Sequence, residues 1–316
     1  MSVYTSVSPE QLTAWLQQYP LGKLLDLKGI ASGITNTNYF VTTESGRYVL
    51  TLFERNSAEE LPYFLDLMAH LADHGIPCPH PVANSGQRYL SELNGKPAAL
   101  VSCLRGSSLE IPDVAHCAAM GRVLARMHLA GLSFGATMAN PRGPLWWKGA
   151  AESVLPYMEA QQRKMLEDEI VYQAGFRFLA LPRGVIHGDM FRDNVLFEGS
   201  ELTGLIDFYY ACNDVLAYDL AITVNDWCVT EDGSLDEARL RAMLVAYHAE
   251  RTLTSAEHEA WPALLRAAAL RFWLSRLYDL HHPREGEITH AKDPEHFRRI
   301  LAERIRHQDA LQAVWV

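Results

Sequence analysis

The sequence predicts an α+β fold in two parts, a small antiparallel sheet with one main helix and a larger, mostly helical body. Short strand-like segments dominate the N-terminal third of the chain, and long amphipathic patterns dominate the rest. Two short hairpin arms, between Val185 and Phe208, interrupt the helical pattern. We expect the boundary at Leu104, which divides the chain into residues 1–104 and 105–316.

The N-terminal part should open with a short helix, because Ser8 is a suitable N-cap and Pro9 suits a first turn. Apolar residues spaced three and four apart predict the main helix over residues 59–74, and Gly75 should end it. Strands are expected over residues 25–31, 39–43, 47–53, 88–92 and 98–103.

The remainder should be mostly helical. Helices are expected over residues 112–131, 152–174, 216–228 and 236–251. Thr254 and Glu257 form a capping-box pattern for a long helix to about residue 279, and Asp293 with Pro294 should start the last helix. Residues 140–148, with Trp146 and Trp147, are expected to be irregular.

Composition limits the class of protein. A net charge of −10 argues against a surface that binds nucleic acid, and no apolar run is long enough to span a membrane. The start of the chain lacks a secretion signal. Five cysteines, with no C-x-x-C pair, favour reduced thiols in the cytoplasm over a disulfide framework or a zinc site. Monomer and homodimer both remain open.

The residues that point to chemistry lie on the two hairpin arms. Asp189 follows His187 and Gly188, four residues separate it from Asn194, and Asp207 lies on the second arm. One carboxylate can orient and deprotonate a hydroxyl, while an amide and a second carboxylate can hold Mg²⁺ on nucleotide phosphates. A buried hairpin with polar caps is the alternative, but the full spacing is more specific than an isolated triplet.

This spacing resembles the catalytic loop of the aminoglycoside phosphotransferase family, small-molecule relatives of the protein kinases. The resemblance implies a two-lobed, protein-kinase-like fold and the cofactors ATP and Mg²⁺. It implies that Asp189 is the catalytic base and that Asn194 and Asp207 bind the metal. It further implies that His187 anchors the loop and that Asp219 holds the loop backbone in place.

The same resemblance assigns nucleotide contacts. Gly33, Thr35 and Asn36 lie in a small-residue loop that matches the family's nucleotide-covering loop, and Leu104 lies at the hinge whose backbone binds adenine. Thr51 stands on the third strand where many members carry a lysine. We therefore expect Mg²⁺, backbone N–H groups and a base from elsewhere to balance the phosphate charge.

Residues 33–40, 48–54, 224–228 and 271–279 resemble the bacterial homoserine kinase branch of this family, in which threonine is expected at that strand position. This implies phosphorylation of the side-chain hydroxyl of homoserine, a step toward threonine. An amino alcohol, methylthioribose, an aminoglycoside or a protein serine or threonine remains open as the acceptor. A non-catalytic binding module is disfavoured, because Asp189, Asn194 and Asp207 are all present.

A site for zwitterionic homoserine needs an acid near the ammonium group and a base near the carboxylate. Asn225 and Asp226 follow Asp219 by about two helical turns and could bind the ammonium group. The candidates for the carboxylate are Arg192, Arg271, Arg276 and Arg284. Each arginine could equally form a surface or helix–helix ion pair.

Overall fold

The computed structural model describes residues 4–30, 36–176, 180–282, 292–313 and 315. Its internal contacts divide the chain into two compact units. The first unit comprises Met1–Gly106 and Thr203–Ile206, and the second comprises Ser107–Leu202 and Asp207–Val316. The second hairpin arm therefore contributes a short segment to the first unit.

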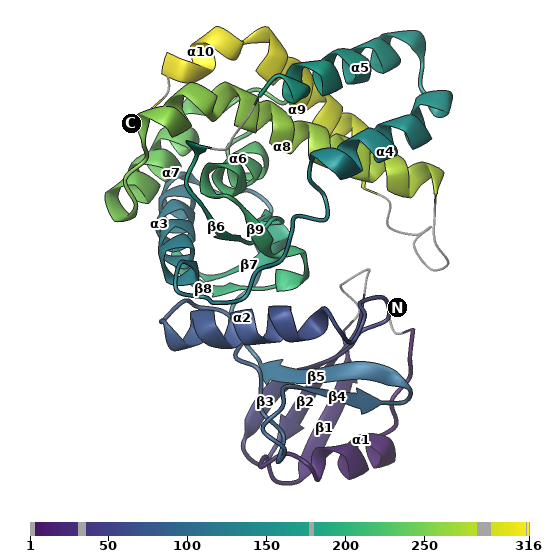
Figure 1. Cartoon of the computed structure of the whole chain (residues 1–316). Coiled ribbons are helices and arrows are strands. Elements are labelled where there is room, and N and C mark those ends of the chain that lie inside the picture. The colour runs from purple at the N-terminus through teal and green to yellow at the C-terminus, as the bar shows by residue number, and fades with distance from the viewer. Residues whose placement is uncertain (1–3, 31–35, 177–179, 283–291, 314, 316) are drawn as a thin grey trace. The chain divides into compact units, whose positions relative to one another are not determined.

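Five antiparallel strands form the sheet of the first unit: β1 (Leu24–Gly29), β2 (Thr37–Thr43), β3 (Gly46–Leu52), β4 (Leu90–Leu93) and β5 (Lys96–Ser102). Their order across the sheet is β1-β2-β3-β5-β4 (Figure 1). The residues of β2 alternate between buried and half-buried, as expected for a strand with one face in a core. All five expected strands are present, with ends shifted by at most two residues.

Two helices complete the first unit. The helix α1 (Pro9–Leu16) begins with the expected Ser8 cap, whose hydroxyl accepts the N–H of Gln11 at 3.2 Å. Its buried side chains, including Trp15, join Val41 and Leu50 of the sheet in one apolar core. The helix α2 (Leu61–Asp73) is followed by Gly75 at φ 78°, a left-handed conformation that favours glycine at a helix end.

The rest of the chain consists of helices and two short strand pairs (Figure 1), and of these strands only β8 lies partly in the first unit. The helices are α3 (Val114–Gly131), α4 (Pro144–Val154), α5 (Ala160–Ala174), α6 (Leu216–Trp227), α7 (Glu237–Glu250), α8 (Ser255–His281), α9 (Pro294–Arg306) and α10 (Gln308–Ala313). The strands β6 (Arg183–Ile186) and β9 (Cys212–Val215) pair antiparallel, and β7 (Val195–Glu198) pairs with β8 (Glu201–Leu205). The helix α8 contacts α4, α5, α6, α9 and α10.

The sequence expectation for residues 140–174 was wrong in two respects. Residues 144–154 form the helix α4 rather than an irregular segment, with Pro144 at its first turn and Trp147 buried. The expected continuous helix over residues 152–174 is interrupted by a 3₁₀ turn, Leu155–Tyr157. Pro156 contributes to the interruption, because proline lacks the N–H that a continuous helix would bond to the carbonyl four residues earlier.

The C-terminal helices agree better with expectation. The predicted capping box of α8 is confirmed, since the Thr254 hydroxyl accepts the N–H of Glu257 at 3.2 Å and the Glu257 carboxylate accepts the N–H of Thr254 at 2.9 Å. Asp293 caps α9 as predicted. However, α9 is not the last helix, because α10 follows it after His307.

The helices α3 and α7 approach each other closely at Gly121. A Cβ atom placed on this residue would lie 2.2 Å from the carbonyl oxygen of Met243. Backbone atoms rather than a flexible side chain stand in the way, so the spacing of the two helices requires glycine at this position.

In the described parts of the chain, no helix has both the length and the apolar character needed to cross a membrane. The predicted α+β architecture is confirmed, with an antiparallel sheet in the first unit and a mostly helical second unit.

Candidate active site

The predicted catalytic loop begins where β6 ends. After Ile186 the chain passes through His187 and Gly188 to Asp189. Gly188 has a φ of 76°, and a Cβ atom placed on it would lie 2.9 Å from the carbonyl oxygen of Tyr210. Any other residue would meet both backbone strain and a clash, so glycine permits the turn that leads to Asp189.

Asp219, which lies on α6, holds this loop through hydrogen bonds to its backbone. Its fully buried carboxylate accepts the backbone N–H groups of His187 at 2.8 Å and Gly188 at 2.9 Å, and Nε2 of His128 lies 3.0 Å away. Burial alone would raise the pKa of Asp219, but the hydrogen bonds that the carboxylate accepts from His128 and from the backbone of His187 outweigh it, so the pKa is lowered. The carboxylate therefore remains ionised and keeps its capacity to accept hydrogen bonds.

A buried polar chain continues from Asp219 into the helical body. Nδ1 of His128 lies 2.7 Å from the Tyr247 hydroxyl, and Nε of Arg251 donates to the same hydroxyl at 2.7 Å. The Arg251 guanidinium also pairs with Glu257, which forms the capping box of α8 with Thr254. Burial lowers the pKa of His128, so its ring is neutral at pH 7.

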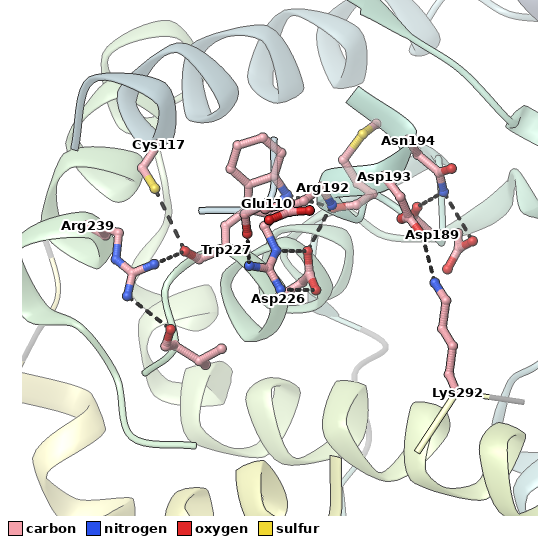
Figure 2. Close-up of polar contacts among 12 residues, drawn as sticks. Glu110, Cys117, Asp189, Arg192, Asp193, Asn194, Asp226, Trp227, Arg239 and Lys292 are labelled. Carbon is pink, nitrogen blue, oxygen red and sulfur yellow. Dashed lines mark hydrogen bonds and ion pairs between the residues drawn. The ribbon is translucent and has the colours of Figure 1, made fainter. Parts of the chain in front are cut away.

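The structure brings Asp189 and Asn194 together (Figure 2). A 3₁₀ turn, Arg192–Asn194, returns the chain toward Asp189. Nδ2 of Asn194 donates to the backbone carbonyl of Asp189 at 2.8 Å and to its carboxylate Oδ2 at 3.2 Å. These bonds occupy the nitrogen of the amide, and within the described chain its oxygen receives no hydrogen bond. That oxygen is therefore available to a metal ion.

Asp207 occupies a special backbone conformation directly after the second hairpin. Its φ of 66° and ψ of 56° are left-handed, a region that aspartate and asparagine tolerate better than most residues. Loss of solvation is the largest cause that raises the pKa of Asp207 to about 7, and repulsion from Asp189 and Asp193 adds to it. Because the Asp207 residue is exposed to solvent, repulsion from the neighbouring carboxylates is the more important physical cause of this rise.

These donors suit Mg²⁺ that arrives with a nucleotide. In the described residues, no three His, Cys, Asp or Glu side chains converge to hold a metal without help. Mg²⁺ commonly takes only one or two carboxylates from the protein and completes its shell with water and phosphate oxygens. The amide oxygen of Asn194 and the carboxylate of Asp207 match this pattern of hard oxygen ligands.

The residues predicted to bind the substrate ammonium group are engaged elsewhere. Asn225 is fully buried, donates to the carbonyl of Leu265 at 2.8 Å and accepts from Nε of Arg304 at 3.0 Å. The Asp226 carboxylate accepts from the backbone N–H of Arg192 at 2.8 Å and from its Nε at 3.1 Å (Figure 2). Asp226 and Arg192 therefore fix the end of the predicted catalytic loop to α6, and Asn225 ties α6 to α8 and α9.

The candidate nucleotide contacts lie in the first unit. Gly33 and Thr35 fall outside the described residues. Asn36 is buried, and its Oδ1 accepts the backbone N–H of Glu54 at 3.3 Å. Leu104 is half-buried after β5. Thr51 is buried and donates to Oδ1 of Asn38 at 2.8 Å, so it serves as a core residue of the sheet.

Comparison with known proteins names the family. A model of the phosphotransferase enzyme family matches residues 26–253. The chain belongs to this family. It is 62% identical over 316 residues to a homoserine kinase of Methylobacillus flagellatus, covering all of this chain and 99% of that protein. It is 59% identical to a homoserine kinase of Methylobacillus glycogenes, with the same coverage.

The fold agrees with the family. An amicoumacin kinase of known structure superposes with a TM-score of 0.70 at 14% identity, and the match covers 96% of this chain and 94% of that one. At this identity the likeness shows the fold alone. The expectations of a phosphotransferase family member and of a kinase-like α+β fold are confirmed.

Two cations near the phosphotransferase loop come from distant parts of the sequence. Nζ of Lys292 lies 2.7 Å from Oδ2 of Asp193, and Nη1 of Arg271 lies 3.7 Å from Oδ1 of Asp189 (the former is drawn in Figure 2). Burial raises the pKa of Asp189, and the charges of Arg271 and His187 oppose that rise. Sequence analysis did not select Lys292, because no local pattern links residue 292 to residue 193.

Proposed function

We propose that this phosphotransferase transfers the γ-phosphoryl group of ATP to the side-chain hydroxyl of L-homoserine. The observation that carries the proposal is full-length similarity, at 62% and 59% identity, to two proteins named homoserine kinase. The loop that joins Asp189 and Asn194 supports the same reaction class, because it provides a base and a metal ligand five residues apart.

In this proposal Asp189 accepts a hydrogen bond from the substrate hydroxyl, directs its oxygen at the γ-phosphorus and takes its proton. Asn194 and Asp207 would hold Mg²⁺, which when bound neutralises charge on the nucleotide phosphates. Phosphoryl transfer has a loose transition state, so positioning of the hydroxyl matters more than strong basicity. The bonds from Asp219 to the backbone of His187 and Gly188 support that positioning.

We also propose that the backbone around Gly33, Thr35, Asn36 and Leu104 contacts the nucleotide. The five cysteines have no disulfide partner in the structure, which supports a reducing compartment such as the cytoplasm for this reaction.

A panel of acceptors tests the proposed function. ATP consumption is measured with L-homoserine, L-serine, choline and kanamycin, and the phosphorylated product is identified by ³¹P NMR. We expect kcat/KM for homoserine to exceed that for each other acceptor by at least about 10²-fold. Preferential turnover of choline or kanamycin would show that homoserine is not the acceptor. Absence of ATP turnover with every acceptor would favour a non-catalytic binding module.

A further inference from the structure

Arg271 is a buried cation beside the candidate base with few partners of its own. It lies on α8, and its side chain is 5% exposed. Its guanidinium stacks 3.7 Å from the ring centre of Phe272 and 5.4 Å from that of Tyr210. Its contact with Asp189, 3.7 Å between Nη1 and Oδ1, is longer than a hydrogen bond. Among the described residues, its guanidinium makes no hydrogen bond.

Other buried arginines of the second unit are bonded differently. Arg266 donates to Glu169 through Nε at 3.1 Å, and Arg304 donates to Asn225 at 3.0 Å. Arg251 donates to Tyr247 at 2.7 Å. At each of these positions the chain supplies the guanidinium with at least one hydrogen-bond acceptor, although Nη2 of Arg304 has none.

The other arginines proposed for the substrate carboxylate also have partners or lie outside the structure. Arg192 is bonded to Asp226, and Nη1 of Arg276 donates to the carbonyl of Asp293 at 2.8 Å. Arg284 falls outside the described residues. Arg271 is thus the described candidate whose hydrogen-bonding capacity is open.

A buried guanidinium without hydrogen bonds is costly, and an anionic ligand would offset that cost. Its planar set of donors fits a carboxylate in a two-pronged manner. Arg271 is the strongest charge that lowers the pKa of Asp189, and its Nη1 lies 3.7 Å from the carboxylate of this candidate base.

We infer that Arg271 determines acceptor specificity by binding the α-carboxylate of the amino acid whose hydroxyl Asp189 receives. The inference rests on the proposed homoserine phosphorylation. Three carbon atoms separate the hydroxyl oxygen of homoserine from its carboxylate group, so one molecule can reach both residues. The 3.7 Å separation of Asp189 and Arg271 matches so short an acceptor.

The test compares two acceptors that differ by the carboxylate alone. L-homoserine and 3-aminopropan-1-ol are assayed with the wild-type protein and with Arg271→Gln. Because any effect of the substitution on Asp189 acts on both acceptors alike, the informative quantity is the ratio of kcat/KM for homoserine to that for aminopropanol, which we expect to fall by about 10²–10³-fold. The KM for ATP should not change. An equal loss with both acceptors, or a rise in the KM for ATP, would overturn the inference and point to an effect on Asp189 or on phosphate.

Arg266→Gln is the matched control, because it also removes a buried guanidinium but one that is bonded to Glu169 on another helix. It should lower the melting temperature without changing the ratio of the two acceptors. If Arg271→Gln does not fold, Arg271→Lys keeps the charge and loses the planar donors. The KM for homoserine should then rise by about tenfold, and an unchanged KM would overturn the inference.

The two proposals fail in different ways. If the wild-type protein does not phosphorylate homoserine, the proposed function fails. If it does, but the Arg271 variants lose both acceptors equally, only the role of Arg271 fails.

Discussion

At the scale of single residues, the carboxylates of Asp189, Asp193 and Asp207 repel one another in the metal-free protein. This repulsion opposes folding, and a bound cation would relieve it. Asp207 adds a second requirement, because its left-handed backbone suits few side chains. Charge and backbone conformation can be separated experimentally, since asparagine keeps the second property and loses the first.

We predict that Asp207→Asn raises the melting temperature of the metal-free protein at pH 8 by roughly 1–3 °C, because one repelling charge is removed. The same variant should lose the effect of Mg²⁺ on nucleotide binding. Asp207→Ala is the control: it removes the same charge but also the tolerance for positive φ, so it should gain less stability than Asp207→Asn. A lower melting temperature for the asparagine variant would contradict the prediction.

The pKa of about 7 at Asp207 predicts a pH dependence of metal binding. Mg²⁺ needs the ionised carboxylate, and protonation increases as pH falls through 7. The apparent affinity for Mg²⁺ in the presence of nucleotide should therefore fall between pH 8 and pH 6, by up to about tenfold per unit below the pKa. In the metal-free protein, by contrast, the contribution of Asp207 to stability improves as pH falls. Because its pKa is higher in the folded than in the unfolded state, the ionised group lowers the free energy of unfolding above pH 7, and this effect is lost progressively below pH 7. Titrations with Mg²⁺ at both pH values check this, and an affinity independent of pH would refute it.

Asp189→Asn should reduce kcat by about 10³-fold or more, because the base is lost. Nucleotide affinity should change by less than about threefold, since we assign Mg²⁺ to Asn194 and Asp207. Turnover and the Kd of a non-hydrolysable ATP analogue are measured on the same preparation. Retained turnover would exclude Asp189 as the base.

At the scale of elements, the close approach of α3 and α7 at Gly121 makes a sharp test of packing. Gly121→Ala should destabilise the fold by about 2–3 kcal/mol, because the new methyl group meets the carbonyl of Met243. Gly149→Ala in α4 is the matched control, since a Cβ atom there meets nothing within 4 Å. It should stabilise the fold by about 0.5–1 kcal/mol through helix propensity. Urea unfolding of both variants measures the difference, and equal effects would contradict the packing argument.

Elements defined by local chemistry could be predicted from the sequence. The caps at Ser8 and Thr254 and the helix end at Gly75 depend on neighbours a few residues away, and each was found. The expectation for residues 140–174 was wrong, because tryptophan-rich α4 lacks a clear periodic pattern and a single proline, Pro156, separates two helices.

The contacts of the candidate site can also be divided into those that are local in sequence and those that depend on the tertiary fold. The spacing of Asp189 and Asn194 is local, and the structure places the two side chains in contact. The surroundings of Asn225, by contrast, depend on Leu265 and Arg304, which are remote in sequence. The pairing of Asp193 with Lys292 likewise needs the tertiary fold. Sequence spacing therefore indicated which residues are close along the loop, but not which of the distant polar residues remain free.

At the scale of the whole molecule, nucleotide binding should be measurable as stability. With an ATP analogue and Mg²⁺ at about 100 times the Kd, the free energy of unfolding should rise by about 2.7 kcal/mol. A chelator should remove most of this gain if Asn194 and Asp207 act through the metal. Thermal unfolding with and without EDTA checks the prediction, and an equal gain in both conditions would contradict the metal assignment.

The buried chain from Arg251 to Asp219 has one permitted direction. An ionised Asp219 can only accept, so Nε2 of His128 must carry the proton, and in a neutral ring Nδ1 then accepts from the Tyr247 hydroxyl. The oxygen of that hydroxyl in turn accepts from Arg251, which keeps its protons. Arg251 can only donate and Asp219 can only accept. If one hydrogen bond of this chain is lost, a change in the protonation of the remaining groups therefore cannot restore it. Oxidation or substitution of Tyr247 in α7 would therefore remove the hydrogen bond to His128, and with it part of the contacts that hold the loop carrying Asp189.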